Sequence, residues 1–383
     1  MTKNAEAKTD KKLVLITVII SVFLIFTIVL LFVVARKDEA LQGADQAIKL
    51  SAQGGFNCEY AEAQKLYAFG EGILKVTGDR VAYLTLSGNE VFSNSVNFSN
   101  PQAYIKGDKA IVFDMNGYGF VLLDHEHVIM DKPTQNKIKS ATLANDDKVA
   151  IITDSSDAYG EVIIYTYSEN NVYEWGWTSY NSGYPLSVTF NNDSTLFAVT
   201  TLSTSGAVYE PFIRLFTLTK PETGTYEDYA THSVEEVTMF ASAMYCEDTL
   251  FTFSADSIYI LGNNKDSVLT RLDLDLGAIN QVNCVDDMIY VVHSDGVDQV
   301  NKLAILNSNG EVIYDSPVGN DIKAVALSNN LYALSIDRRI YVYNTNGDIQ
   351  SDIEVDEDVL RIGFIGNNKL VVISTSGVHT VDY

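Results

Sequence analysis

One short segment carries aromatic side chains at alternate positions. In the run YEWGW, Tyr173, Trp175 and Trp177 fall on one face of a strand, because successive side chains of a strand point to opposite sides. If exposed, this stripe would suit a sugar ring or a hydrophobic partner, and if buried it would fill the space between packed sheets. We therefore single out these three residues as candidate partner-binding residues and keep the packing alternative open.

Other segments have the residue types of metal or catalytic sites without the required pattern. Asp124-His125-Glu126-His127 brings two imidazoles close in sequence but offers no third ligand, and the acidic loop 154–161 lacks the alternating ligands of a calcium loop. Acidic pairs such as Asp286-Asp287 fall in turns, where Asp caps its own backbone. Nucleophile elbows, Walker loops and dinucleotide fingerprints are missing. We expect no catalytic residue, no metal and no cofactor, and therefore no enzyme.

The elements that must position these residues are short strands. From residue 55 to the C terminus, runs rich in Val, Ile, Tyr, Phe and Thr alternate with turn clusters such as SGNE, NSNG and NTNG. This texture is typical of many strands joined by tight hairpins. Long helical periodicity is absent, so we predict an all-β domain.

The same phrase of four strands recurs along this domain. Its eight copies begin near residues 65, 102, 137, 185, 237, 281, 322 and 359, a mean spacing of about 42 residues. A four-stranded sheet that repeats with a period of 40 to 50 residues indicates a β-propeller, because one twisted sheet cannot bury both faces and must stack on its neighbours. We predict an eight-bladed β-propeller. Seven blades, or an open β-solenoid, are the alternatives, because the unit boundaries near 185 and 237 are loose.

The last repeat supplies three strands before the chain ends at Tyr383. The strand-like segment 55–62, GFNCEYAE, directly precedes the first repeat. We predict that it completes the final blade, which would tie the two ends together and remove an open sheet edge.

Insertions on a repeat scaffold are where functional variation usually sits. Three longer loops, 153–160, 201–211 and 219–226, belong to the third and fourth repeats. We expect any binding edge to lie there.

The N-terminal region predicts a membrane anchor. Residues 13–35 contain no charge, and 19 of these 23 residues are Leu, Ile, Val or Phe. At about 1.5 Å per residue they would span roughly 34 Å as a helix, enough for a hydrocarbon core of about 30 Å. The run is longer than a secretory signal and is followed by Arg36-Lys37-Asp38-Glu39 rather than by a small-residue cleavage site. We expect it to be retained as a single-pass transmembrane helix.

Charge around this helix predicts its orientation. Four lysines precede it and Arg36 and Lys37 follow it, which favours a cytoplasmic N terminus. The predicted organisation is a cytoplasmic tail (1–12), a transmembrane helix (13–35), a stalk or linker helix (36–54) and an extracytoplasmic propeller (55–383). The stalk is expected because residues 38–53 are Ala-rich with apolar residues at roughly helical spacing.

Composition narrows the class of partner. Beyond residue 35 the chain holds 22 basic and 48 acidic residues, a net charge of −26. This balance argues against nucleic acid and against docking on anionic lipid, since both require basic patches. Cys58, Cys246 and Cys284 are too few for a disulfide framework. Cys246 and Cys284 fall at matching points of neighbouring repeats, so either a bridge or two buried thiols is conceivable.

Three phrases carry a family resemblance: LSGNEVFSNSV (86–96), NSNGEVIYDSPV (307–318) and NTNGDIQSDIEV (344–355). They look like degenerate repeats of quinoprotein-like (PQQ-like, YVTN-like) propellers, where a Gly turn precedes a strand with an aromatic residue. With the opening FGEGILKV and the single N-terminal anchor, the chain resembles an uncharacterised family of membrane-anchored propeller proteins of clostridial bacteria, a domain of unknown function. The resemblance implies fold and location. The quinone-binding and calcium-binding residues of the dehydrogenases have no counterparts here.

These observations predict a non-catalytic scaffold or sensor that binds an envelope protein or a cell-wall component. A cell-envelope hydrolase or lyase acting at the channel mouth is the alternative, and convergent carboxylates at one mouth would favour it. A passive assembly factor for other envelope proteins is the third possibility.

Overall fold

A computed structural model describes residues 47–58, 61, 64–168, 171–218, 229–274, 276–285, 287–294, 300–319, 322–328, 330–366 and 368–383, without the side chains of 168 and 171–175. The chain divides into two compact units, Met1–Ile48 and Lys49–Tyr383. The second unit contains the elements that follow.

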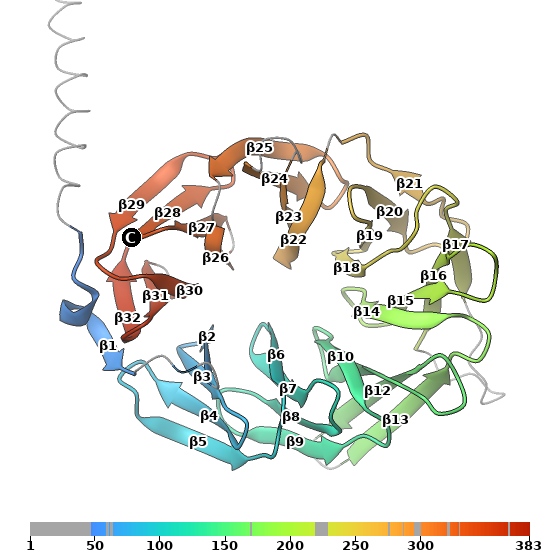
Figure 1. The fold of residues 1–383 in the computed structure, drawn as a ribbon, viewed down its shortest axis with the longest axis horizontal. Coiled ribbons are helices and arrows are strands. Elements are labelled where there is room, and N and C mark those ends of the chain that lie inside the picture. The colour runs from blue at the N-terminus through green and yellow to red at the C-terminus, as the bar shows by residue number, and fades with distance from the viewer. Residues whose placement is uncertain are drawn as a thin grey trace, which may run out of the picture. The chain divides into compact units, whose positions relative to one another are not determined.

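Lys49–Tyr383 forms a ring of eight four-stranded antiparallel sheets, or blades (Figure 1). In each of blades 1 to 7 the strands follow one another in sequence from the innermost to the outermost. Blade 1 consists of β2 (Lys65–Phe69), β3 (Gly72–Val76), β4 (Arg80–Thr85) and β5 (Glu90–Ser95). Blade 2 consists of β6 (Pro101–Lys106), β7 (Lys109–Asp114), β8 (Gly119–Leu123) and β9 (Val128–Pro133). Blade 3 consists of β10 (Ile138–Leu143), β11 (Lys148–Thr153), β12 (Glu161–Ser168) and β13 (Asn171–Thr178). Blade 4 consists of β14 (Tyr184–Phe190), β15 (Leu196–Ser203), β16 (Glu210–Thr217) and β17 (Ala230–Ser233).

The second half of the ring repeats this order. Blade 5 consists of β18 (Ser242–Cys246), β19 (Thr249–Phe253), β20 (Ile258–Gly262) and β21 (Thr270–Arg271). Blade 6 consists of β22 (Ala278–Val285), β23 (Met288–Ser294), β24 (Asn301–Asn307) and β25 (Val312–Gly319). Blade 7 consists of β26 (Ile322–Ser328), β27 (Leu331–Ile336), β28 (Arg339–Asn344) and β29 (Ile349–Glu354). Blade 8 consists of β30 (Val359–Ile365), β31 (Lys369–Ser374), β32 (Gly377–Asp382) and β1 (Gly54–Asn57).

The prediction of an all-β, eight-bladed propeller is confirmed, and the seven-bladed and solenoid alternatives are wrong. The predicted repeat starts at 237 and 281 differ most from the observed ones. The first strands of blades 5 and 6, β18 and β22, begin at Ser242 and Ala278.

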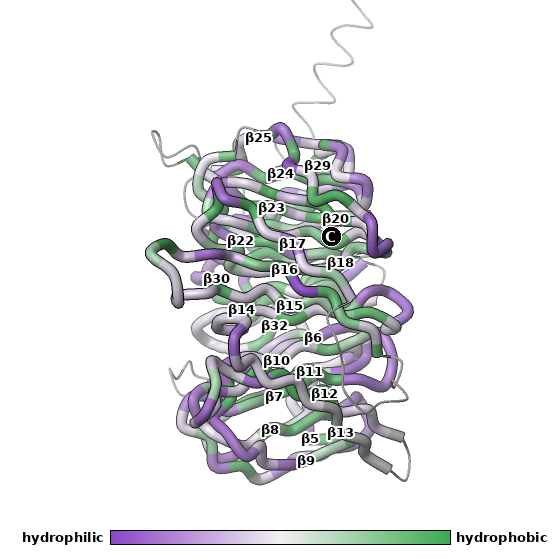
Figure 2. Tube along the Cα trace, turned by 90° about the vertical axis from the view of Figure 1, so that its right-hand side faces the viewer, coloured by the Kyte–Doolittle hydropathy of each residue, from purple (hydrophilic) through white to green (hydrophobic). Residues whose placement is uncertain are grey.

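The middle strands of each blade are buried on both faces. In β7 the run Ala110–Asp114 is buried throughout, as is Phe120–Leu123 in β8. A strand covered on both faces needs apolar residues at consecutive positions, which explains the continuous apolar runs in the sequence. Hydrophobic residues accordingly follow the strands and hydrophilic ones gather in the turns (Figure 2).

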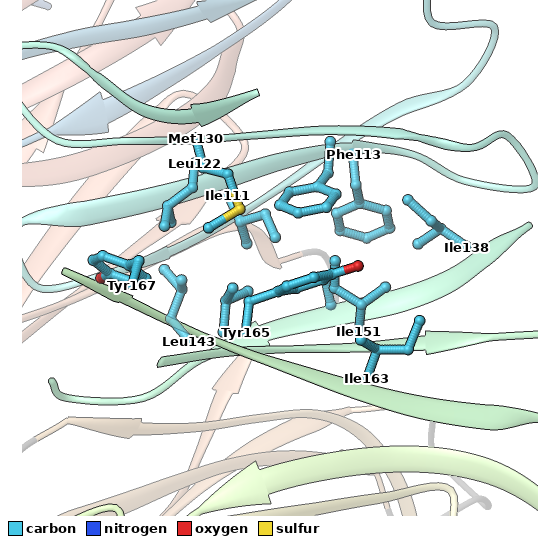
Figure 3. Close-up of a cluster of buried hydrophobic side chains, with 13 residues drawn as sticks. Ile111, Phe113, Leu122, Met130, Ile138, Leu143, Ile151, Ile163, Tyr165 and Tyr167 are labelled. Atoms are coloured by element: carbon cyan, nitrogen blue, oxygen red, sulfur yellow. The ribbon is translucent and has the colours of Figure 1, made fainter. Parts of the chain in front are cut away.

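The core lies between the blades. Between blades 2 and 3, Phe113 and Leu122 face Ile151 and Tyr165 (Figure 3). Similar clusters join blade 1 to blade 2 and blade 8 to blade 1. Because each blade buries its faces on its neighbours, stability depends on a closed ring.

The Asn-Gly turns form where the sequence places them. Asn307 Oδ1 accepts from the backbone N–H groups of Asn309 and Glu311, both at 3.0 Å, and Gly310 has φ +82°. In the equivalent turn of the next repeat, Asn344 Oδ1 accepts from the backbone N–H groups of Asn346 and Asp348. An Asn side chain that mimics a backbone turn, followed by a residue at positive φ, fixes both turns in the same geometry.

Ring closure by the N-terminal segment is also confirmed. β1 pairs antiparallel with β32, with Phe56 opposite Val378. Gly55 has φ +130°, and a Cβ atom there would lie 2.0 Å from the carbonyl oxygen of Val378. Glycine is therefore required at this position.

The predicted stalk helix (36–54) is wrong over the part of it that the structure describes. Residues 50–52 form a single 3-10 turn, η1 (Leu50–Ala52), and β1 begins two residues later. Leu41, Ala44, Ile48 and Leu50 have roughly helical spacing in the sequence, but Leu50 is fully buried and its N–H donates to Asp356 Oδ1 at 2.9 Å. Tertiary contacts with blade 8 therefore override the weak helical pattern.

The predicted cytoplasmic tail, the transmembrane helix and the first part of the stalk lie outside the described residues. Among the residues that are described, no helix has the length and apolar character to cross a membrane.

Cys246 and Cys284 lie on neighbouring blades and are not joined by a disulfide. A hydrogen bond with Cys284, together with burial, raises the pKa of the Cys246 thiol. Of the two alternatives for this pair, the structure shows the unbridged one.

Candidate functional site

Exposed apolar side chains concentrate on one face of the ring. Strands within a blade alternate in direction, so the turns between second and third strands and the links between blades lie on the same face. Seven of the thirteen large hydrophobic residues that are exposed in the described chain lie on this face, over blades 2 to 5. We call this set the aromatic face; it comprises Met115, Tyr118, Tyr180, Tyr184, Val208, Tyr209 and Met239.

The opposite face is different. It is formed by the turns between first and second strands and between third and fourth strands, and we call it the polar face. Its described turns carry Glu71, Asp108, Asp124, Asp147, Asp193, Glu247, Asp248, Glu311 and Asp348. Val268, which is 78% exposed, lies in one of its turns, and the exposed residues Val312 and Ile349 directly follow two others, at the first positions of β25 and β29.

Blade 2 contributes the turn between β7 and β8 to the aromatic face. The backbone of this turn is fixed by neighbouring segments: the N–H of Met115 donates to Asn100 O at 3.0 Å, and Tyr118 O accepts from Thr134 N at 2.8 Å. Because its backbone groups are bonded, the turn presents the Met115 and Tyr118 side chains outward, 38% and 49% exposed.

The segment that links blade 3 to blade 4 is packed against both blades. The Tyr159 and Tyr184 rings meet edge to face at 4.8 Å between centroids. Ser179 Oγ donates to Gly183 O at 2.6 Å, and a Cβ atom on Gly183 would lie 2.4 Å from the backbone of Leu202. Tyr184 is paired with Leu202 near the end of β15, where the β15–β16 turn that carries Val208 and Tyr209 begins.

Carboxylates surround the apolar residues on blades 4 and 5. Glu210 follows Tyr209 directly, and Glu235 and Glu236 lie in the link that also carries Met239; all three are exposed. The arrangement suits a partner segment with both apolar and basic side chains, since opposite charge at the rim steers and orients association.

The predicted loops fall partly on this face. Residues 153–160 and 201–211 contain the β11–β12 and β15–β16 turns, both on the aromatic face. The third loop, 219–226, joins β16 to β17 and lies outside the described residues.

The aromatic stripe of β13 is described only at one end. Trp177 is half-buried, and its ring centroid lies 5.0 Å from that of Phe216, so it fills space between blades 3 and 4. The side chains of Tyr173 and Trp175 lie outside the described residues, and their role in binding stays a prediction.

The Asp124-His125-Glu126-His127 segment does not converge. Asp124 Oδ1 accepts from the N–H groups of Glu126 and His127, both at 2.8 Å, and so closes the turn. His125 packs on Phe69 at 4.3 Å between ring centroids. The described residues contain no group of three His, Cys, Asp or Glu side chains arranged to hold a metal ion.

One constellation was missed from the sequence. Ser374 Oγ and Ser376 Oγ donate to Glu357 Oε2 at 2.7 and 2.5 Å, and lie 3.2 and 3.3 Å from His379 Nε2. Burial lowers the pKa of His379 against the opposing effect of Glu357. Burial also opposes ionisation of Glu357, but the two hydroxyl groups and His379 outweigh it and lower its pKa.

This Ser-His-Glu group is built to close the ring. A hydroxyl that donates its only proton to Glu357 cannot also give it to His379, whereas a nucleophilic serine requires that transfer. His379 is 2% exposed. The same segments bind the N-terminal strand region, because Asp356 accepts from Leu50 and Ser376 O accepts from Cys58 N at 2.9 Å.

Solved structures confirm the fold at low sequence identity. Sqt1 of Saccharomyces cerevisiae is 11% identical with a TM-score of 0.56, covering 86% of this chain and 100% of that chain. BamB of Moraxella catarrhalis is 13% identical with a TM-score of 0.51, covering 86% and 99%. Chaetomium thermophilum Sqt1, bound to the N-terminus of the ribosomal protein L10, is 12% identical with a TM-score of 0.53, covering 84% and 92%.

No curated protein matches the sequence. A family model does match it over residues 48–382, which is nearly the whole of the ring. The chain therefore belongs to DUF5711, a family of unknown function.

Proposed function

We propose that this protein is a membrane-anchored, extracytoplasmic scaffold or sensor that binds a protein partner on its aromatic face. Anchoring and orientation rest on the apolar run 13–35 and on the lysines that precede it. The partner is a protein of the cell envelope that offers apolar and basic side chains.

A single observation carries the binding proposal. The aromatic face gathers seven exposed large hydrophobic residues, and the polar face has three among the described residues. Exposed apolar side chains gathered on one surface mark sites of interaction, because leaving them in water costs about 25 cal/mol per Å². Tyr and Met are also enriched at protein interfaces.

The fold is consistent with this role. A Sqt1 propeller of similar fold binds the N-terminus of a ribosomal protein. A closed ring stabilises loops without help from metal or disulfide, so its loops can specialise for binding. The acidic rim formed by Glu210, Glu235 and Glu236 would select a basic partner segment.

The test uses the full-length protein with a C-terminal tag in intact cells. A photo-crosslinking residue is placed at Tyr209 on the aromatic face or, as the matched control, at Val268 on the polar face. We expect one discrete crosslinked partner from position 209 and none from 268. The pair Val208→Ser and Tyr209→Ser should abolish capture of that partner by the tagged chain, and Val268→Ser should leave it unchanged.

Equal crosslinking from both positions would contradict the proposal. The topology is checked separately: protease added to intact cells should remove the C-terminal tag. A protected tag in intact cells, digested after lysis, would overturn the extracytoplasmic location.

A further inference from the structure

The inner wall of the ring has a charge opposite to that of the whole chain. We define the inner wall as the eight innermost strands, β2, β6, β10, β14, β18, β22, β26 and β30 (Figure 1). These strands, all within the described residues, contain no Asp or Glu in a chain of net charge −24. Their charged residues are Lys65, Lys106, Lys139, Lys323 and Arg361.

Arg361 lies along the inner edge of blade 1. It belongs to β30 of blade 8, yet its guanidinium carbon is 4.7 Å from the centre of the Tyr67 ring on β2. Its Nη1 donates to Leu66 O at 3.4 Å. One edge of β2 is hydrogen-bonded to β3, and the other edge is free and faces the ring axis. Because the Arg361 side chain comes from blade 8 and binds Leu66 O, it lies along this free edge.

Lys65 lies next to this guanidinium. Lys65 and Tyr67 are two positions apart on β2 and so share a side of the strand. Lys65 Nζ donates to Pro101 O at 2.8 Å and to Gln102 Oε1 at 3.2 Å. Burial, and then the charge of Arg361, lower the pKa of Lys65.

Two cations therefore repel each other, and no described carboxylate is bonded to either of them. Within the described part of the chain, the hydrogen-bond partners of Lys65 and Arg361 are carbonyl and amide oxygens. Lys139, by contrast, is 3.4 Å from Asp154 Oδ2 and is already neutralised. Two neighbouring positive charges that only neutral oxygens solvate are stabilised when an anion binds between them.

Solvent reaches this part of the inner wall. Lys65, Tyr67, Gln102 and Arg361 are all half-buried, and Tyr104, two residues beyond Gln102 on β6, is 40% exposed. A ligand can therefore approach from the axis, and partial burial strengthens its attraction to the two cations.

We propose that Lys65 and Arg361 form a binding site for a phosphate-type dianion on the inner wall. A dianion balances both positive charges, whereas a monoanion leaves one unbalanced. The guanidinium supplies a planar pair of donors and the ammonium a compact charge, a combination suited to phosphate oxygens. The site is independent of the aromatic face and of its protein partner.

The test measures binding of small phosphates to the full-length protein in a non-ionic detergent, by isothermal titration calorimetry at about pH 7.5. Inorganic phosphate and methyl phosphate are predominantly dianions there, because the second pKa is about 6, and dimethyl phosphate is a monoanion. We expect both dianions to bind at least about tenfold more tightly than dimethyl phosphate. Tight methyl phosphate binding would indicate a terminal phosphate group on a larger ligand, and binding of inorganic phosphate alone would indicate the free ion.

Lys65→Gln and Arg361→Gln should each weaken binding of the dianions by about tenfold or more. The control removes the same charges elsewhere: Lys369→Gln and Arg80→Gln change two exposed residues on other strands and should leave affinity unchanged. Arg361→Lys keeps the charge and should bind with an intermediate affinity. Circular dichroism checks that each variant is folded.

The wild-type protein decides the proposal even if a variant fails to fold. No binding of inorganic phosphate or methyl phosphate to the wild type overturns it. So does equal affinity for dimethyl phosphate, or an equal loss in the control variants, because either would show nonspecific attraction to positive charge.

Discussion

The two faces of the ring are made from the same repeat, yet they differ in turn length and chemistry. On the polar face, the first and second strands of blades 1, 2 and 5 are joined by two-residue turns, among them Gly107-Asp108 and Glu247-Asp248. On the aromatic face, the β11–β12 and β15–β16 turns and the two links that flank blade 4 have five to eight residues, and exposed Tyr, Val and Met side chains lie in or next to them. In a two-residue turn both residues are needed to close the turn. Longer loops have further positions, which can carry side chains for binding.

A second difference concerns how the loops are held. Polar-face turns are closed by their own side chains, as with Asp124 and Asn344. On the aromatic face, the link between blades 3 and 4 has a bond of its own, from Ser179 Oγ to Gly183 O, and is also packed through Gly183 against the backbone of Leu202 in β15. Changes on the two faces should therefore have effects of different size.

Glycine substitutions should give the largest difference in unfolding free energy between the two faces. Gly183 (φ +82°) is packed on Leu202, and Gly107 (φ +59°) faces open space. Gly183→Ala combines left-handed strain with overpacking and should lower the free energy of unfolding by about 3 kcal/mol. Gly107→Ala has strain alone, about 1 to 2 kcal/mol. Urea unfolding measures both, and equal losses would show that the link of blade 3 is not rigidly packed.

The ring-closing group on blade 8 should make stability depend on pH. His379 and Glu357 both have lowered pKa values, so the folded state binds fewer protons and stability rises with pH. Acidification below about 6.5 should destabilise the fold through His379, and below about 4.5 through Glu357. Glu357→Gln should remove the second decline and cost about 1 to 2 kcal/mol at neutral pH.

Unfolding measured across this pH range tests the assignment. Asp348→Asn on the polar face is the control, because Asp348 is exposed and its carboxylate bonds Asn344 within its own turn. An unchanged acid limb in Glu357→Gln would place the pH dependence elsewhere.

Removing a self-closing side chain should have a smaller effect. Asn344→Ala loses three hydrogen bonds within its own turn and should cost about 1 kcal/mol in unfolding free energy. Asn346→Ala changes an exposed side chain in the same turn and should stay within about 0.5 kcal/mol. A loss above about 2 kcal/mol for Asn344→Ala would mean that polar-face turns also support the core.

Exposed residues of the aromatic face should matter least for stability. Tyr209→Ser changes a side chain that is 62% exposed and should alter the unfolding free energy by less than about 0.5 kcal/mol. The same change is expected to remove partner capture. A large loss of stability would instead assign Tyr209 a structural role.

Several features of the fold could be predicted from particular residues. The turn phrases at 307–311 and 344–348 predict the third-to-fourth strand connections, because Asn and Gly specify that geometry locally. The truncated last repeat predicts the pairing of β1 with β32, because an open sheet edge must be covered. The stalk helix was predicted wrongly over 50–53, where Leu50 is bound by blade 8, far away in sequence.

The candidate sites were harder to predict from the sequence than the fold. The longer loops pointed to blades 3 and 4, but Met115, Tyr118 and Met239 join the aromatic face only through the alternation of strand direction. The inner-wall charges could have been found by comparing the first strand of every repeat, which contains Lys or Arg five times and no carboxylate.

By itself the sequence determined what depends on local patterns: strands from apolar runs, turns from Asn and Gly, blade number from the repeat, and the prediction of an anchor from an uncharged stretch. Tertiary structure alone decided which distant side chains meet. It brought Arg361 to Tyr67 and Lys65, and Glu357 to His379 and the Leu50 segment, because these contacts join the last repeat to the first part of the ring. Such contacts follow from ring closure, and no local pattern in either segment specifies its partner.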